Sequence, residues 1–191
     1  MTSLGAFIAR IAEALAGANV SYMFVGSIAS THHGAPRSTQ DVDLVVALGP
    51  ADISRVLASF PDAHYYVSAD AVRAAVRSRG MFNIIDLETG WKADFVVAKA
   101  RPFSQQELAR RLPVEVLGVP TWIATAEDTI VAKLEWSSLA GGSARQQTDV
   151  SGIIAAMTRG DEQRLDLEYI EHWTEELGVR AVWDTLWATR R

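Results

Sequence analysis

The run Asp41-Val42-Asp43-Leu44-Val45-Val46 begins with two carboxylates and continues as an apolar segment. This pattern is typical of a β-strand that enters a core. In a strand, side chains at i and i+2 point the same way, about 6.5 to 7 Å apart along the chain. Asp41 and Asp43 therefore share one face, where they repel each other unless a cation lies between them, and their hard oxygen atoms suit magnesium. The alternative is a pair of solvated aspartates at a strand edge, and the apolar continuation weighs against it.

A third carboxylate, Asp94, is the one acid in a second apolar segment, 91–98. This segment follows the apolar run 81–87 through Glu88-Thr89-Gly90, which is a hairpin signal. A half-buried carboxylate in such a strand needs a partner or a metal. If its strand pairs beside the Asp41–Asp43 strand, three carboxylates converge. Asp86 is a competing candidate, ranked lower because the adjacent turn places it towards the far end of the hairpin.

Gly26-Ser27 lies where a predicted strand, 21–25, passes into a predicted helix. A glycine at that place lets the backbone approach a ligand closely, and the free N–H groups of a helix start favour an anion. The alternative is an ordinary turn and N-cap. Together with the aspartates, Gly26 and Ser27 indicate a site that holds the β- and γ-phosphates of a nucleoside triphosphate.

Two magnesium ions held by the three aspartates would have separate roles. One would neutralise the triphosphate and position its α-phosphorus, and the other would lower the pKa of an attacking hydroxyl group. The reaction class implied is nucleotidyl transfer with pyrophosphate as the leaving group.

Helical and strand patterns alternate up to residue 124, and the remainder of the chain is helical in pattern. The expected fold class is α/β (α+β), with a mixed β-sheet flanked by helices. The expected domains are an αβ core over 1–124 and a helical C-terminal part over 125–191, packed on the core because no linker-like stretch separates them. Thr125 to Asp128 has the form of a capping box at the start of that part. The predicted helices are 7–16, 28–32, 52–60, 69–79, 102–111, the one after Thr125 through 139, 146–157, 166–177 and 179–187, and the predicted strands are 21–25, 41–46, 81–87 and 91–98, with 114–124 extended.

Composition excludes several classes of protein. The 191 residues include no cysteine, which excludes disulfides, a thiol nucleophile and thiolate zinc sites. The net charge of −5 disfavours a role in non-specific nucleic-acid binding. An acidic enzyme can still hold a triphosphate when a metal supplies the positive charge. No apolar run approaches the ~20 residues that cross a bilayer and no signal peptide is recognised, so we expect a cytoplasmic protein without membrane contact.

Gly26-Ser27, Asp41-Val42-Asp43 and Asp94 together resemble the signature of the polymerase-β-type nucleotidyltransferase superfamily. The chain is most similar to small bacterial stand-alone members related to the abortive-infection toxin nucleotidyltransferases. The resemblance runs from about residue 16 to residue 177, and its combined spacing is more specific than any one fragment. Its further segments are Gly34-Ala35-Pro36-Arg37-Ser38-Thr39-Gln40 before Asp41, Phe82-Asn83-Ile84-Ile85-Asp86, Lys133, and Arg145-Gln146-Gln147-Thr148-Asp149.

The resemblance implies the nucleotidyltransferase fold and a site for magnesium and a triphosphate. The implied catalytic and metal-binding residues are Asp41, Asp43 and Asp94, and the implied nucleotide-binding residues are Gly26, Ser27, Arg37, Thr39, Lys133 and Arg145. Two alternatives stay open for the C-terminal residues: Lys133 as a solvated charge, and Arg145 with Asp149 as an i, i+4 surface pair. The neighbouring His32 and His33 point to different helix faces and make a poor metal pair.

The acceptor of the nucleotide is open: a tRNA 3′ end, a protein hydroxyl or a small hydroxylated molecule, with the acidic charge favouring the last two. Two other functions remain as alternatives. One is a toxin–antitoxin component that acts through a cognate protein partner, and the other is a nucleotide sensor that binds without catalysis.

Overall fold

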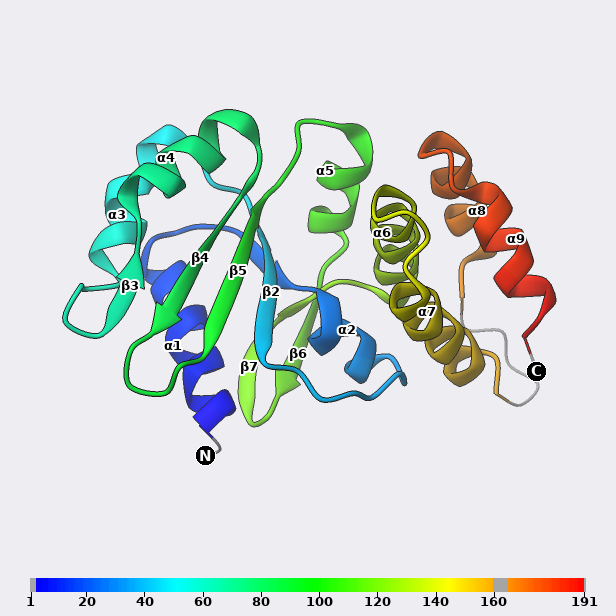
Figure 1. The fold of residues 1–191 in the computed structure, drawn as a ribbon, viewed down its shortest axis with the longest axis horizontal. Helices are drawn as coiled ribbons and strands as arrows, with labels where there is room; N and C mark the ends of the chain where they lie inside the picture. Colours follow the sequence, from blue (N-terminus) through cyan, green and yellow to red (C-terminus); the bar gives the residue numbers. More distant parts are fainter. Residues whose placement is uncertain (1–2, 160–164, 191) are drawn as a thin grey trace. The chain divides into compact units, whose positions relative to one another are not determined.

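The computed structural model describes residues 3–159 and 165–190. The chain forms two compact units, the first made of Met1–Val25 with Thr39–Ala124 and the second of Gly26–Ser38 with Thr125–Arg191. The first unit holds the β-sheet, and the second is helical (Figure 1). The segment Gly26–Ser38 was assigned from the sequence to the αβ core, and it clusters with the C-terminal helices.

Within the described residues, seven strands form one mixed sheet in the order β3-β4-β5-β2-β1-β7-β6. β2 runs parallel to β5 and β1 parallel to β7, while the other neighbouring pairs are antiparallel. The mixed sheet and the 81–98 hairpin are confirmed, whereas β3 was not predicted. The strands are β1 (Tyr22–Phe24), β2 (Asp41–Val46), β3 (Tyr65–Val67), β4 (Met81–Asp86), β5 (Lys92–Val97), β6 (Leu112–Val116) and β7 (Val119–Ile123).

One face of this sheet is covered by helices and forms the core of the first unit. Phe95 of β5 stacks on Phe82 of β4, with ring centroids 4.9 Å apart, and meets the edge of Phe60, which follows α3. α4 packs against β4 and β5, and α1 buries Phe7 and Ile11 completely. The helical elements of this unit are α1 (Ser3–Gly17), the 3-10 helix η1 (Pro50–Asp52), α3 (Ile53–Ala58), α4 (Ala69–Ser78) and α5 (Pro102–Ala109).

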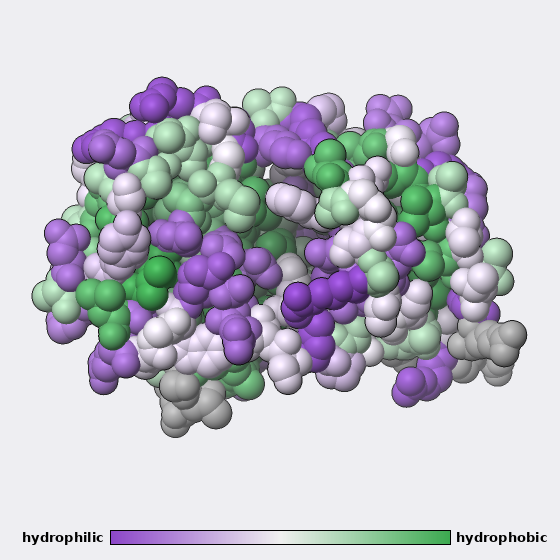
Figure 2. All heavy atoms as spheres, viewed as in Figure 1, coloured by the Kyte–Doolittle hydropathy of each residue, from purple (hydrophilic) through white to green (hydrophobic). Residues whose placement is uncertain are grey.

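The opposite face of the sheet is apolar near α5 and carries both polar and apolar side chains elsewhere. Met23 and Val45 form a buried cluster there, with Leu108 of α5 packed against it. Because side chains alternate along a strand, the residues that precede Val45 on this face are Asp43 and Asp41. Figure 2 shows hydrophilic residues gathered over β5 and β2.

The second unit is a cluster of helices held by an apolar core. α6 packs against α2, α7 and α8, and α9 packs against α7 and α8. Trp183 is buried and stacks on Trp187. The helices are α2 (Gly26–His32), α6 (Ala126–Leu139), α7 (Ala144–Met157), α8 (Leu167–Glu176) and α9 (Arg180–Ala188).

Thr125 is the N-cap residue of α6. Its hydroxyl oxygen accepts a hydrogen bond from the Asp128 amide at 3.1 Å and donates to the Asp128 carboxylate at 2.8 Å. This pair satisfies one of the free N–H groups of the first helical turn. Across residues 3–159 and 165–190, the structure contains no helix with the length and apolar character to cross a membrane.

Candidate functional site

The register of β2 against β5 brings the predicted acids onto neighbouring strands. Asp43 lies directly opposite Asp94, and Asp41 lies directly opposite Lys92. Residues paired across neighbouring strands share a face, and so do residues two apart on one strand. Asp41, Asp43 and Asp94 therefore lie on the same face of the sheet. The strand pairing on which the three-acid prediction depended is present.

Lys92 adds a positive charge to this row of acids. Its Nζ lies 2.9 Å from Asp94 Oδ2 and 3.5 Å from Asp41 Oδ2. The hydrogen bond to Asp94 raises the pKa of Lys92 above its ordinary value, burial opposes this, and the charges of Asp94 and Asp41 add to the increase. The Asp94 side chain is 17% exposed and that of Asp41 is 48% exposed, so the row opens to solvent at Asp41.

The donor chemistry of the row fits magnesium. Three carboxylates on one face supply hard oxygen ligands, and a cationic group already bridges two of them. Among the described residues, however, no three acidic or histidine side chains form a group that could hold a metal ion. The aspartates are aligned by the strands, but their oxygen atoms are not gathered round a common centre.

Local hydrogen bonds position the start of β2. The Thr39 hydroxyl donates to the Asp41 carbonyl oxygen at 2.6 Å and accepts from the Asp41 amide at 3.3 Å. On the other side of the strand, the Val25 amide donates to the Asp43 carbonyl oxygen at 2.9 Å. Thr39 therefore orients the strand that carries the acids, and Gly26 is the next residue along the chain after Val25.

Asp86, the competing candidate, has a structural role. Its carboxylate is buried on the helix-covered face, where it pairs with Arg10 of α1 and accepts the amides of Glu88 and Thr89 at 2.9 and 3.1 Å. Burial raises the pKa of Asp86, but the two amides and Arg10 outweigh it and hold the pKa below its ordinary value. The lower ranking of Asp86 agrees with this position.

Gly26 and Ser27 begin α2 in the second unit. Gly26 has φ = +57°, in the left-handed region that favours glycine. Ser27 is 1% exposed, and its Oγ has no hydrogen-bond partner among the described residues. A buried hydroxyl without a partner is costly in a folded protein, so Ser27 is a polar group that a ligand could satisfy.

Lys133 is buried in an ion-paired cluster of the second unit. Its Nζ lies 2.7 Å from Asp149 Oδ2 and 3.0 Å from Gln146 Oε1, and Arg37 Nε lies 3.2 Å from the same Asp149 oxygen. Lys133 is 5% exposed, which contradicts the alternative of a solvated charge. Sequence spacing could not reveal this, because the cluster joins residues of α6, α7 and the loop after α2.

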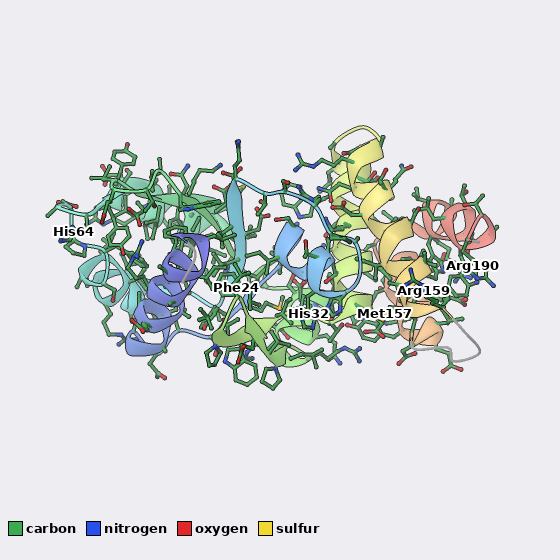
Figure 3. The ribbon with its side chains drawn as sticks, turned by 90° about the horizontal axis from the view of Figure 1, so that it is seen from below. Phe24, His32, His64, Met157, Arg159 and Arg190 are labelled. Atoms are coloured by element: carbon green, nitrogen blue, oxygen red, sulfur yellow. The ribbon has the colours of Figure 1, made fainter. Side chains whose placement is uncertain are left out.

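Arg145 and the two histidines lie outside that cluster. Arg145 is exposed on α7 and forms no ion pair among the described residues, so the predicted pair with Asp149 is not observed. His32, labelled in Figure 3, is exposed while His33 is buried, and their rings meet edge-on at 5.0 Å.

Sequence reasoning missed two residues of the acidic face. Lys92 and Asn83 were not singled out, although Asn83 lies directly opposite Asp94 on β4. The signal for Lys92 was present, since it stands two residues before Asp94 and an i, i+2 pair in a strand shares a face. Asn83 required the hairpin register, which the sequence does not specify to the residue.

The chain is similar to known proteins in its three-dimensional structure, and the sequence identity to them is low. No protein-family model and no curated protein matches the chain. The solution structure of the antibiotic-resistance factor ANT(2'')-Ia matches with a TM-score of 0.57 at 14% identity, over 98% of this chain and 94% of that one. The crystal structure of ANT(2'')-Ia in complex with adenylyl-2''-tobramycin matches with a TM-score of 0.58 at 13% identity, over 94% and 99%.

A third solved structure is an antigenic nucleotidyltransferase-like protein from Paracoccidioides brasiliensis. It matches with a TM-score of 0.54 at 17% identity, over 96% of this chain and 91% of that one. At these identities the similarity concerns the fold. The mixed sheet with its flanking helices, shared along nearly the full length of these proteins, shows that the chain has the nucleotidyltransferase fold that its sequence resemblance predicted.

Proposed function

We propose that the protein is a magnesium-dependent nucleotidyltransferase that transfers a nucleoside monophosphate from a triphosphate to a hydroxyl acceptor. The observation that carries this proposal is the β2–β5 register, which aligns Asp43 with Asp94 and places Asp41 on the same face. The fold shared with ANT(2'')-Ia supports it. Asp41, Asp43 and Asp94 would hold two magnesium ions, which supply charge neutralisation at the phosphates and acidify the attacking hydroxyl group.

The transfer exchanges one phosphorus–oxygen bond for another. The acceptor oxygen forms a bond to the α-phosphorus, the bond from that phosphorus to the bridging oxygen breaks, and pyrophosphate leaves. The acceptor proton would pass to a carboxylate, and we assign this role to Asp94, which lies opposite Asp43. Gly26 and the buried Ser27 hydroxyl are proposed to bind the phosphates.

The side chains on the surface beside Asp94 indicate the chemical character of the acceptor. On β4 the neighbouring outward residues are Asn83, opposite Asp94, and Met81, which is 51% exposed. Tyr66 of β3 lies opposite Ile85 and is 58% exposed. These side chains carry no charge and include one exposed aromatic ring. They favour an acceptor that presents a planar or apolar group next to its hydroxyl, and tRNA, protein and small molecules all contain such groups.

The test is transfer of label from each α-labelled nucleoside triphosphate in the presence of magnesium and clarified cell extract. Asp43→Asn removes one charge from the row, and we expect it to abolish transfer while leaving the melting temperature near that of the wild type. Glu115→Gln, on the exposed strand β6, is the matched control and should transfer normally. The labelled product is assigned by its sensitivity to nuclease or protease.

Transfer that persists in Asp43→Asn would contradict the proposed site. Triphosphate binding without transfer to any fraction would favour a nucleotide sensor. Transfer that begins only when a cognate protein is supplied or removed would favour the toxin–antitoxin alternative.

A further inference from the structure

Lys92 lies between two of the carboxylates that are proposed to bind metal. Lys92 lies on the same face as Asp94, which follows it by two residues on β5. Lys92 is also paired in register with Asp41 of β2. Its Nζ is within 2.9 Å of Asp94 Oδ2 and 3.5 Å of Asp41 Oδ2. The lysine side chain is 32% exposed, so the ion pairs are partly shielded from water. Partial burial strengthens such pairs relative to those at a fully exposed surface.

The ammonium group of Lys92 offsets the repulsion between the aspartates. Asp41, Asp43 and Asp94 place three negative charges on neighbouring positions of one face, and Lys92 returns one positive charge to them. Lys92 therefore offsets part of the negative charge that the strands bring together. The same arrangement places the ammonium against the oxygen atoms of Asp94 and Asp41 that a metal would use.

We infer that Lys92 is an internal counter-ion that competes with the divalent cation for Asp41 and Asp94, and that this competition sets the metal affinity of the site. The inference rests on the proposed function, since it assumes that these carboxylates bind metal. Two cations that share the same carboxylate oxygens repel each other, so metal binding requires the lysine side chain to move. The four-carbon stem of lysine and its rotatable bonds allow that movement.

The ion pairs of Lys92 differ in geometry from the coordination of a metal ion. An ammonium group donates to separate carboxylates along several directions, whereas a bound metal draws oxygens to about 2.1 Å from one centre. In the observed row, Lys92 contacts both Asp94 and Asp41. Lys92 is a positioning residue, because it acts on the acids and not on the substrate.

The test measures Mn²⁺ binding to the whole chain without nucleotide, by the loss of the free Mn²⁺ signal in electron paramagnetic resonance. Lys92→Met keeps the length of the stem and removes the charge. We expect it to bind Mn²⁺ about tenfold tighter or more than the wild type, because a repulsive charge has left the site. Lys92→Arg retains the charge and should bind like the wild type. Lys99→Met removes the same charge from an exposed position beyond β5 and is the matched control.

Thermal unfolding gives a second readout that does not depend on activity. Without metal, Lys92→Met should melt below the wild type, because the three aspartates lose their counter-ion. With saturating Mn²⁺, it should show a larger rise in melting temperature than the wild type, since a cation that binds the folded state more tightly stabilises it more.

Mn²⁺ affinity that is unchanged or weaker in Lys92→Met would overturn the inference. If the wild type also transfers label, that outcome leaves the proposed function intact and removes the role of Lys92 alone. If neither the wild type nor any variant binds Mn²⁺ and no label is transferred, the proposed function fails together with the inference.

Discussion

Replacing Asp149 with asparagine should destabilise the protein strongly, because it breaks a buried ion pair from one side. Lys133 and Asp149 have side chains that are 6% and 8% exposed, with 2.7 Å between Nζ and Oδ2. In Asp149→Asn the buried lysine loses the carboxylate oxygen that lies 2.7 Å from its Nζ, and Arg37 loses the same partner. Removing one member of a buried pair costs about 3–5 kcal/mol. For a chain of this length each kcal/mol shifts the melting temperature by about 2–4 °C, so we expect a fall of about 6–20 °C.

The measurement is urea and thermal unfolding at pH 7 without nucleotide. Glu176→Gln, an exposed carboxylate on α8 of the same unit, is the control and should change the free energy of unfolding by less than about 0.5 kcal/mol. The double variant Lys133→Met with Asp149→Leu removes both charges of the Lys133–Asp149 pair, and it should recover part of the lost stability because apolar pairs of similar volume replace buried ion pairs at little cost. Arg37 still lacks the Asp149 carboxylate in this variant, so the recovery is incomplete.

A loss below about 1 kcal/mol in Asp149→Asn would refute the reasoning, since removing the carboxylate from a buried ion pair should cost more than that. It would mean that Lys133 reaches water in solution and is available as a nucleotide ligand in the ligand-free protein. A double variant as unstable as the single one would show that the charges themselves stabilise the helices.

Two further predictions concern the first unit. Asp86→Asn should lower the free energy of unfolding at pH 7, and the difference from the wild type should shrink as the pH falls below about 4. The reason is that the folded-state pKa of Asp86 lies below its ordinary value of 3.8, so the stability contributed by the carboxylate is present above that value and is lost on acidification. Urea unfolding between pH 7 and pH 3 measures this change in the free energy of unfolding. A difference between variant and wild type that stays constant over this range would contradict the lowered pKa of Asp86. Tyr66→Ala should raise the KM for the acceptor and leave the KM for the triphosphate unchanged in the label-transfer assay. The neighbouring Tyr65, which accepts a hydrogen bond from Arg10, is not changed in this variant. Equal changes in both KM values would exclude Tyr66 from acceptor binding.

The local pattern of the sequence was sufficient for most elements of the fold. β2, β4 and β5 were predicted because alternation and apolar runs mark strands wherever one face is buried. The Thr125 cap was predicted because its hydrogen bonds join residues three apart. β3 was missed because three residues, Tyr65–Val67, are too few to show a period. Its place at the edge of the sheet depends on pairing with β4, which lies further along the chain.

The acidic residues of the candidate site could be named from the sequence, whereas the positions of the two lysines could not. Asp41, Asp43 and Asp94 could be named because their spacing resembles a known family and each stands out in an apolar strand. Lys92 was overlooked although Asp94 stands two residues further along the same strand, and its second partner, Asp41, is set by a parallel register with a strand far earlier in the chain. Lys133 could be read as solvated because helix position alone does not reveal burial, which depends on α7 and on the loop that carries Arg37.

The sequence by itself determined the chemistry available to this protein: three aspartates in apolar strands, a Gly-Ser turn, and a chain without thiols. These properties are local, because residue type and spacing along a strand or helix decide them. Only the tertiary structure decided which charges meet. It paired Asp86 with Arg10, placed Lys92 between Asp41 and Asp94, and buried Lys133 against Asp149. The physical reason is that an ion pair depends on distance through space, and strand register and helix packing set that distance between residues far apart in the chain.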